Sequence, residues 1–222
     1  GATYQASNGF NALCAGNFTA YVRDANGCVL TINFTITEPT AVVVNTTPVD
    51  ATCNGVCDGT VTVTASGGTG ALEYSLDGTS FQAGNIFNAL CQGNFTVTVR
   101  DANGCIGTVT FTINEPPALT LILNSTTDAT CGQANGIADV TGGGGTGALE
   151  YSLDGITFQA SGNFTGLAPG AYTITVRDAN GCTLTLNVDI LDLSGLTASI
   201  QTQTDVSCFG LTDGDVTIIA SG

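Results

Sequence analysis

The chain has 222 residues, of which 18 are acidic and three are basic, so its formal net charge is −15. It contains no lysine or histidine, and three arginines cannot form the cationic clusters that displace counterions from nucleic acid or bind anionic lipid surfaces. No apolar run reaches the roughly 18 residues of a transmembrane helix. We therefore expect neither nucleic-acid binding nor direct membrane insertion.

Nine cysteines occur without any histidine and without a paired C-x-x-C segment. This composition favours a disulfide framework over a zinc site, and it predicts an extracellular or cell-surface protein. With no histidine or lysine, and with oxidised cysteines, the common pairs of nucleophile and base cannot be assembled. We expect no catalytic residues and no enzyme activity.

An internal repeat organises the whole chain. The heptapeptide VRDANGC ends at Cys28, Cys105 and Cys182, which are equally spaced and define a repeat period of 77. Glu-Pro segments that follow it stiffen short linkers and mark the module edges. The repeat predicts two complete modules at 40–116 and 117–193. Residues 1–39 are expected to be the back part of an earlier module, and 194–222 the front part of a later one.

Within module 40–116, apolar and polar residues alternate with period 2, which is typical of half-buried strands. In chain order the predicted strands are 60–64, 72–76, 95–100 and 108–113. Gly-rich or Asx-Gly turns separate them at 67–70, 77–78 and 101–104. Short strands with one apolar face each predict an all-β fold made of two-sheet β-sandwich modules.

The four cysteines of module 40–116 allow three connectivities. Cys57 and Cys91 are both replaced by alanine in the next module, so we predict that they share one bond. Strand parity agrees with pairing the other two, because Cys105 lies on the same face as Phe111. The predicted disulfides are Cys57–Cys91, Cys53–Cys105 and the equivalent Cys131–Cys182. The cysteines without a predicted partner in this chain are Cys14, Cys28 and Cys208.

The segment Asp-Ala-Asn-Gly begins at Asp24, Asp101 and Asp178. Its oxygen atoms could bind Ca²⁺, but the full EF-hand loop pattern is absent. The alternative is a hairpin turn with glycine in the left-handed region, and this is the interpretation we favour. We expect no cofactor.

The three arginines occupy one position of the repeat. We expect Arg100 to pair across the sheet with Glu73, and Arg177 with Glu150. Exposed pairs of this kind contribute about 0–1 kcal/mol and mainly fix the strand register. A ligand-reading role for these arginines is the alternative.

The segments T-C-x-G, D-G-x-V-x-V-x-A-S-G-G-T-G, Y-S-L-D-G and V-R-D-A-N-G-C, followed by E-P, resemble the SprB repeat. That repeat occurs in very large surface proteins of gliding and filament-forming Bacteroidetes. The resemblance implies immunoglobulin-like modules strung along a cell-surface adhesin or filament, exported by the type IX secretion route. Two departures are that Cys57 and Cys91 are additional to the two-cysteine pattern, and that the loop at 132–135 is one residue shorter.

The predicted function is that of a structural repeat segment, a stalk or spacer in a long extracellular adhesin or filament that resists tension and proteolysis. Its partners would be adjacent modules of the same chain, and parallel copies in a fibre. The alternative is an adhesive module whose loops or sheet face recognise polysaccharide or another surface. The scarcity of outward-facing aromatic residues, and the similarity between the copies, favour a spacer.

Overall fold

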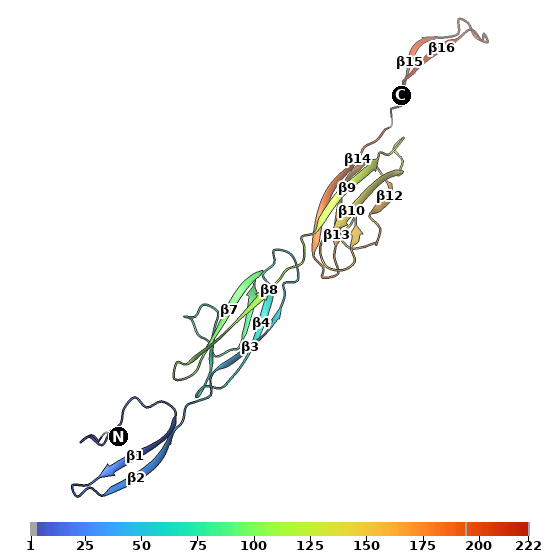
Figure 1. Ribbon diagram of the computed structural model, residues 1–222. Helices are drawn as coiled ribbons and strands as arrows, with labels where there is room; N and C mark the ends of the chain where they lie inside the picture. Colours follow the sequence, from blue (N-terminus) through green and yellow to red (C-terminus); the bar gives the residue numbers. More distant parts are fainter. Residues whose placement is uncertain (1–3, 194, 222) are drawn as a thin grey trace. The chain divides into compact units, whose positions relative to one another are not determined.

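The computed structural model describes residues 4–193 and 195–221, and the regular secondary structure in this part of the chain is entirely β-strand (Figure 1). The all-β fold class expected from the sequence is confirmed. No helix in the described residues is long and apolar enough to cross a bilayer. Residues 1–3, 194 and 222, which belong to the expected segments 1–39 and 194–222, lie outside the described part.

Contacts divide the chain into two compact units. The first comprises residues 1–48, 61–87 and 94–112, and the second comprises residues 49–60, 88–93 and 113–222. The second unit therefore contains all of module 117–193 together with the loop of module 40–116 that carries Cys53 and Cys57.

Module 40–116 contains two three-stranded sheets. The first sheet has the strand order β3-β4-β6, with β3 at Val43–Val49, β4 at Gly59–Ser66 and β6 at Ile86–Leu90. The second has the order β5-β7-β8, with β5 at Glu73–Ser75, β7 at Gly93–Arg100 and β8 at Ile106–Ile113.

Module 117–193 repeats this arrangement. One sheet has the order β12-β10-β9, with β9 at Thr120–Thr127, β10 at Gly136–Gly143 and β12 at Asn163–Leu167. The other has the order β11-β13-β14, with β11 at Glu150–Ser152, β13 at Gly170–Arg177 and β14 at Thr183–Ile190.

The core of module 117–193 lies between its two sheets. Along β13, Ile174 and Val176 are fully buried, while the threonines between and beside them point to the other face. This follows from the strand geometry, in which successive side chains point to opposite sides. Two sheets that bury such faces against each other form a β-sandwich. The buried cluster consists of Ala129, Ala138, Val140, Tyr151, Phe164, Leu167, Ile174, Val176, Val188 and Ile190.

Two hairpins complete the described chain. In the first, β1 (Gly16–Arg23) pairs antiparallel with β2 (Val29–Ile36). In the second, β15 (Thr197–Thr204) pairs antiparallel with β16 (Asp215–Ser221).

The strands recur with the period of the sequence. β4 and β10 begin one repeat period apart, at Gly59 and Gly136, and β7 and β13 do the same, at Gly93 and Gly170. The β1 and β2 hairpin likewise precedes β7 and β8 by one period. The module edges at 39/40, 116/117 and 193/194 stay a prediction.

Candidate functional site

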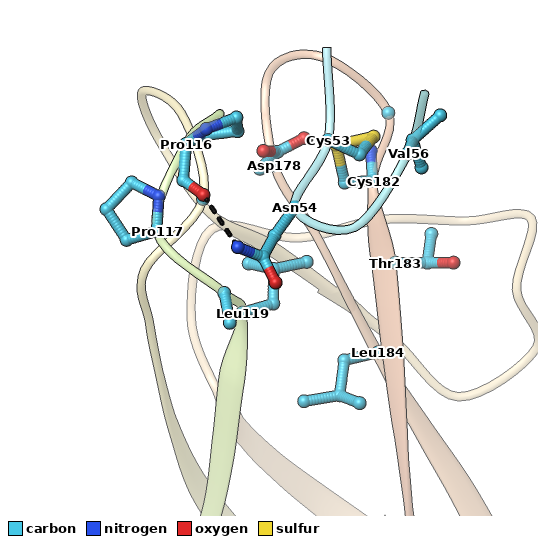
Figure 2. Close-up of a pocket in the computed structure, with 13 residues that line it drawn as sticks. Cys53, Asn54, Val56, Pro116, Pro117, Leu119, Asp178, Cys182, Thr183 and Leu184 are labelled. Carbon is cyan, nitrogen blue, oxygen red and sulfur yellow. Dashed lines mark hydrogen bonds between the residues drawn. A yellow bond between two sulfur atoms is a disulfide. The ribbon is translucent and has the colours of Figure 1, made fainter. Parts of the chain in front are cut away.

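A disulfide joins two successive copies of the sequence repeat. Cys53, in the loop between β3 and β4, is bonded to Cys182, in the hairpin between β13 and β14. The two Cα atoms lie 5.8 Å apart, and 129 positions separate the residues in sequence. Figure 2 shows the bond beside the Pro116-Pro117 linker. Both cysteines belong to the second compact unit.

This bond corrects the expected pairs Cys53–Cys105 and Cys131–Cys182. The structure leaves Cys105 and Cys131 as exposed free thiols. The reason is that strand parity selects a face of a sheet but not an end of the module. The Ala129 N–H donates to the Leu191 carbonyl, so the Cys131 loop lies beside the last residues of β14, whereas Cys182 directly precedes its first residue.

An eight-residue strand spans about 25 Å, far beyond the roughly 7 Å that a disulfide allows between Cα atoms. In module 40–116 the Ala51 N–H donates to the Asn114 carbonyl, just after the end of β8. Cys105 precedes the start of that same strand. The loop cysteine and the hairpin cysteine of one module are therefore held at opposite ends of its final strand.

The second disulfide joins Cys57 to Cys91, the two cysteines that are alanine in the next module. It closes a loop with a sequence separation of 34, and both of its cysteines belong to the second unit. It ties the Cys53 loop to the turn after β6. Cys14, Cys28 and Cys208 are exposed free thiols.

The Cys53 loop is also held by the linker at the end of its own module. The Asn54 amide donates to the Glu115 carboxylate at 2.8 Å and to the Pro116 carbonyl at 3.1 Å. The Gly55 N–H donates to the other Glu115 oxygen at 2.7 Å. Glu115 therefore anchors the loop beside the linker, in addition to any stiffening that the prolines provide.

Sequence reasoning missed this role of Glu115. A usable signal was the acidic residue at the same position of the next repeat, Asp192, whose carboxylate accepts the N–H of Gly132 at 3.1 Å. Both modules thus use an acidic residue at the module end to fix the cysteine-bearing loop.

The Cys182 hairpin is organised around Asp178, one of the three Ca²⁺ candidates. Its buried carboxylate accepts backbone N–H groups from Thr146 at 2.8 Å, Asn180 at 3.0 Å and Cys182 at 2.9 Å. Because both oxygens accept hydrogen bonds from backbone N–H groups, Asp178 stabilises the turn here. The Asn180 side chain donates to the Thr52 carbonyl at 2.9 Å, and so adds a hydrogen bond beside the disulfide.

Asp101 and Asp24 lie in equivalent turns. The Asp101 carboxylate accepts the N–H groups of Thr69, Asn103 and Cys105 at 2.8–2.9 Å, and Asp24 accepts that of Cys28 at 2.8 Å. Burial of Asp101 acts to raise its pKa, but these donors outweigh burial and hold the pKa below its ordinary value. In the described residues, no group of three or more histidine, cysteine, aspartate or glutamate side chains could hold a metal ion.

The arginines stabilise the outer face of the second sheet. Arg177 lies 2.8 Å from Glu150, which it faces across β11 and β13, and its guanidinium sits 3.7 Å from the centre of the Phe158 ring. Arg100 lies 2.7 Å from Glu73 in the same way. The Arg100 guanidinium also lies 3.9 Å from the centre of the Phe81 ring, so Arg100 and Arg177 each have both an anionic and an aromatic partner, which accounts for their positions without a ligand.

An open hollow of about 400 Å³ lies beside the inter-repeat disulfide. Figure 2 shows Leu119 and Leu184 on its floor, with Val56 and the two prolines around it. Gly145 also lines it, with a φ of +65°. A Cβ there would lie 2.8 Å from both Asp178 and Leu119, so glycine permits the close approach of these segments.

Two segments of the chain match the model of a known family. The SprB repeat family model matches residues 45–81 and 200–222. These two segments are similar to the SprB repeat. The first match includes the Cys53 loop, and the second includes Cys208, which lies one repeat period after Cys131. The cysteine-bearing loop thus lies within a matched segment in both places.

No curated protein matches the chain. Among solved structures, the N-terminal eight immunoglobulin domains of Down syndrome cell adhesion molecule, isoform 1.30.30, align at 14% identity and a TM-score of 0.39, covering 84% of this chain and 28% of that one. Extracellular cadherin domains 3–6 of protocadherin gamma B2 align at 14% identity and a TM-score of 0.29, covering 86% and 60%. This chain spans less than two thirds of either protein.

The SprB repeat and the disulfides together indicate a surface or extracellular protein of non-catalytic, structural character.

Proposed function

We propose that this chain is a structural segment of a long extracellular adhesin or filament, in which SprB-type modules form a stalk. The observation that carries the proposal is the Cys53–Cys182 disulfide, because it links one repeat covalently to the next. Recognition of a ligand by a single module does not require such a bond. A stalk under tension benefits from it directly.

The mechanical effect of the bond follows from chain length. It bypasses 129 residues, so a pull on the chain ends is transmitted from Cys53 directly to Cys182. At about 3.5 Å per extended residue, the bypassed segment amounts to about 450 Å of chain that cannot be pulled out while the disulfide is intact.

Export and location are part of the same proposal. Disulfides persist in oxidising compartments, and the net charge of −15 keeps a β-rich chain soluble. By resemblance to other SprB-repeat proteins, we propose the type IX route to the surface of a gliding or filament-forming cell. Adjacent modules of the same chain are the proposed partners, with parallel copies in a fibre.

The ligand-binding alternative requires exposed aromatic residues on the complete modules. Between residues 40 and 193, the large hydrophobic side chains that are exposed are valine, isoleucine and leucine, with no tyrosine or phenylalanine among them. The aromatic side chains of these modules are partly or fully buried, and two of them stack under arginines. This favours the stalk.

Single-molecule force spectroscopy tests the proposal. Oxidised chains pulled from both ends should extend about 450 Å less than the same chains in the presence of a reductant. The Cys105→Ser variant is the matched control and should behave like the parent. Equal extension in both conditions would mean that the repeats are not covalently linked, and the stalk proposal would lose its support.

A further inference from the structure

Two exposed thiols occupy the same repeat positions as the two bonded cysteines. Cys105 is the hairpin counterpart of Cys182, one repeat period earlier. Cys131 is the loop counterpart of Cys53, displaced by one residue because its loop is shorter. Between residues 40 and 193, the chain thus contains, besides the inter-repeat bond, one more example of each half of that bond.

The hairpin that carries the free Cys105 has the same conformation as the hairpin that carries the bonded Cys182. The Cys105 N–H donates to the Asp101 carboxylate at 2.8 Å, as the Cys182 N–H donates to Asp178 at 2.9 Å. The glycines before the two cysteines, Gly104 and Gly181, have φ values of +82° and +86°. Cys105 is therefore presented by the same turn as the cysteine that carries the disulfide.

The loop half is also organised alike. The Thr52 N–H donates to the Asp58 side chain at 2.9 Å, and the Thr130 N–H donates to the Asn135 side chain at 2.9 Å. Each of these bonds closes the loop around its cysteine. In each loop, a backbone N–H also donates to an acidic residue that follows the last strand of the module, Glu115 in the first case and Asp192 in the second.

We propose that Cys105 and Cys131 are inter-module disulfide positions. Cys131 takes the hairpin cysteine of a following SprB-type module, and Cys105 takes the loop cysteine of a preceding one. Each module is then bonded to both of its neighbours. Cys28 and Cys208, the remaining hairpin and loop cysteines, belong to the same two classes. The proposal rests on the tandem arrangement of the proposed stalk.

The chemistry is an ordinary thiol oxidation. Two thiols lose two protons and two electrons as the S–S bond forms, and the disulfide of a thiol–disulfide oxidoreductase accepts them and becomes a dithiol. Both thiols are exposed, so such an enzyme can reach them. The alternative of closing the bond within one module fails, because the loop and the hairpin lie at opposite ends of the last strand.

Duplication of a module inside the full chain tests each half. A second copy of residues 117–193, inserted after residue 193, gives Cys131 a following hairpin. A second copy of residues 40–116, inserted after residue 116, places a Cys105 hairpin after the Cys53 loop. The parent has five free thiols. Each duplicated protein, made under oxidising conditions and titrated after denaturation without reductant, should again have five.

A count two higher than the parent's five, seven, in either protein would overturn the proposal for that half, because the new loop and hairpin cysteines would both be free. Cys131→Ser is the matched control in the first duplication. Made in the first of the two copies, this substitution should raise the number of free thiols by one if that Cys131 is bonded, because its partner cysteine becomes free. It should lower the number by one if that Cys131 is free. The force measurement on the parent chain depends only on Cys53–Cys182, so failure there is distinguishable from failure here.

Discussion

Replacement of Cys182 by serine is the sharpest perturbation of the inter-repeat bond. The disulfide closes a loop with a sequence separation of 129, and the chain-entropy model gives about 5 kcal/mol of stabilisation for a loop of that length. For a unit of this size, a loss of about 5 kcal/mol corresponds to a fall of roughly 10–20 °C in melting temperature. The matched control is Cys105→Ser, which removes an exposed free thiol and should change stability by no more than about 0.5 kcal/mol.

The assay is calorimetry of the two variants and the parent under oxidising conditions, repeated with a reductant. In the reductant, Cys182→Ser and the parent should melt together. If Cys105→Ser lowered the melting temperature as much as Cys182→Ser, the bond would lie within a module and the reasoning from strand ends would be refuted.

Peptide mapping gives an independent reading of the same bond. Trypsin can cut after only three arginines, giving four peptides, and the structure predicts that 24–100 stays linked to 178–222 without reductant. Pairing within modules would instead link 101–177 to both of these peptides. Free thiols must be alkylated before denaturation, so that thiol–disulfide exchange does not change the pairing of the cysteines.

Three further predictions concern single side chains. Hydrogen bonds from the backbone N–H groups of Ile156 and Thr157 hold the pKa of Asp154 below its ordinary value. The unfolded chain therefore binds more protons than the native state near pH 3, and the free energy of unfolding should fall as the pH drops below about 4. In thermal melts over this pH range, the Asp154→Asn variant should lose less stability than the parent. Gly145→Ala should lower the melting temperature more than Gly155→Ala, because both have a positive φ but only the first adds a clash, and equal shifts would contradict the contact with Asp178. Glu150→Gln should cost less than about 1 kcal/mol in denaturant titrations, since the ion pair with Arg177 is exposed, and a larger loss would point to a role beyond strand register.

The central strands of the fold could be predicted from residue alternation alone. The expected strands 60–64 and 95–100 lie inside β4 and β7, which are the middle strands of their sheets. The edge strands β3 and β6 were not predicted. Each is largely exposed on both faces, so its residues carry little period-2 signal.

The sequence by itself determined the repeat period, the single repeat position of the arginines and the faces of the central strands, because these can be read from the spacing of residues along the chain. It could not determine the partner of Cys53. Cys105 and Cys182 occupy the same position in successive repeats, so every argument from composition or parity applies equally to both. Only the tertiary structure decided which of the two is the partner. It places the Cys53 loop beside the end of β8, whereas Cys105 precedes the start of that strand, and a disulfide cannot span the length of a strand.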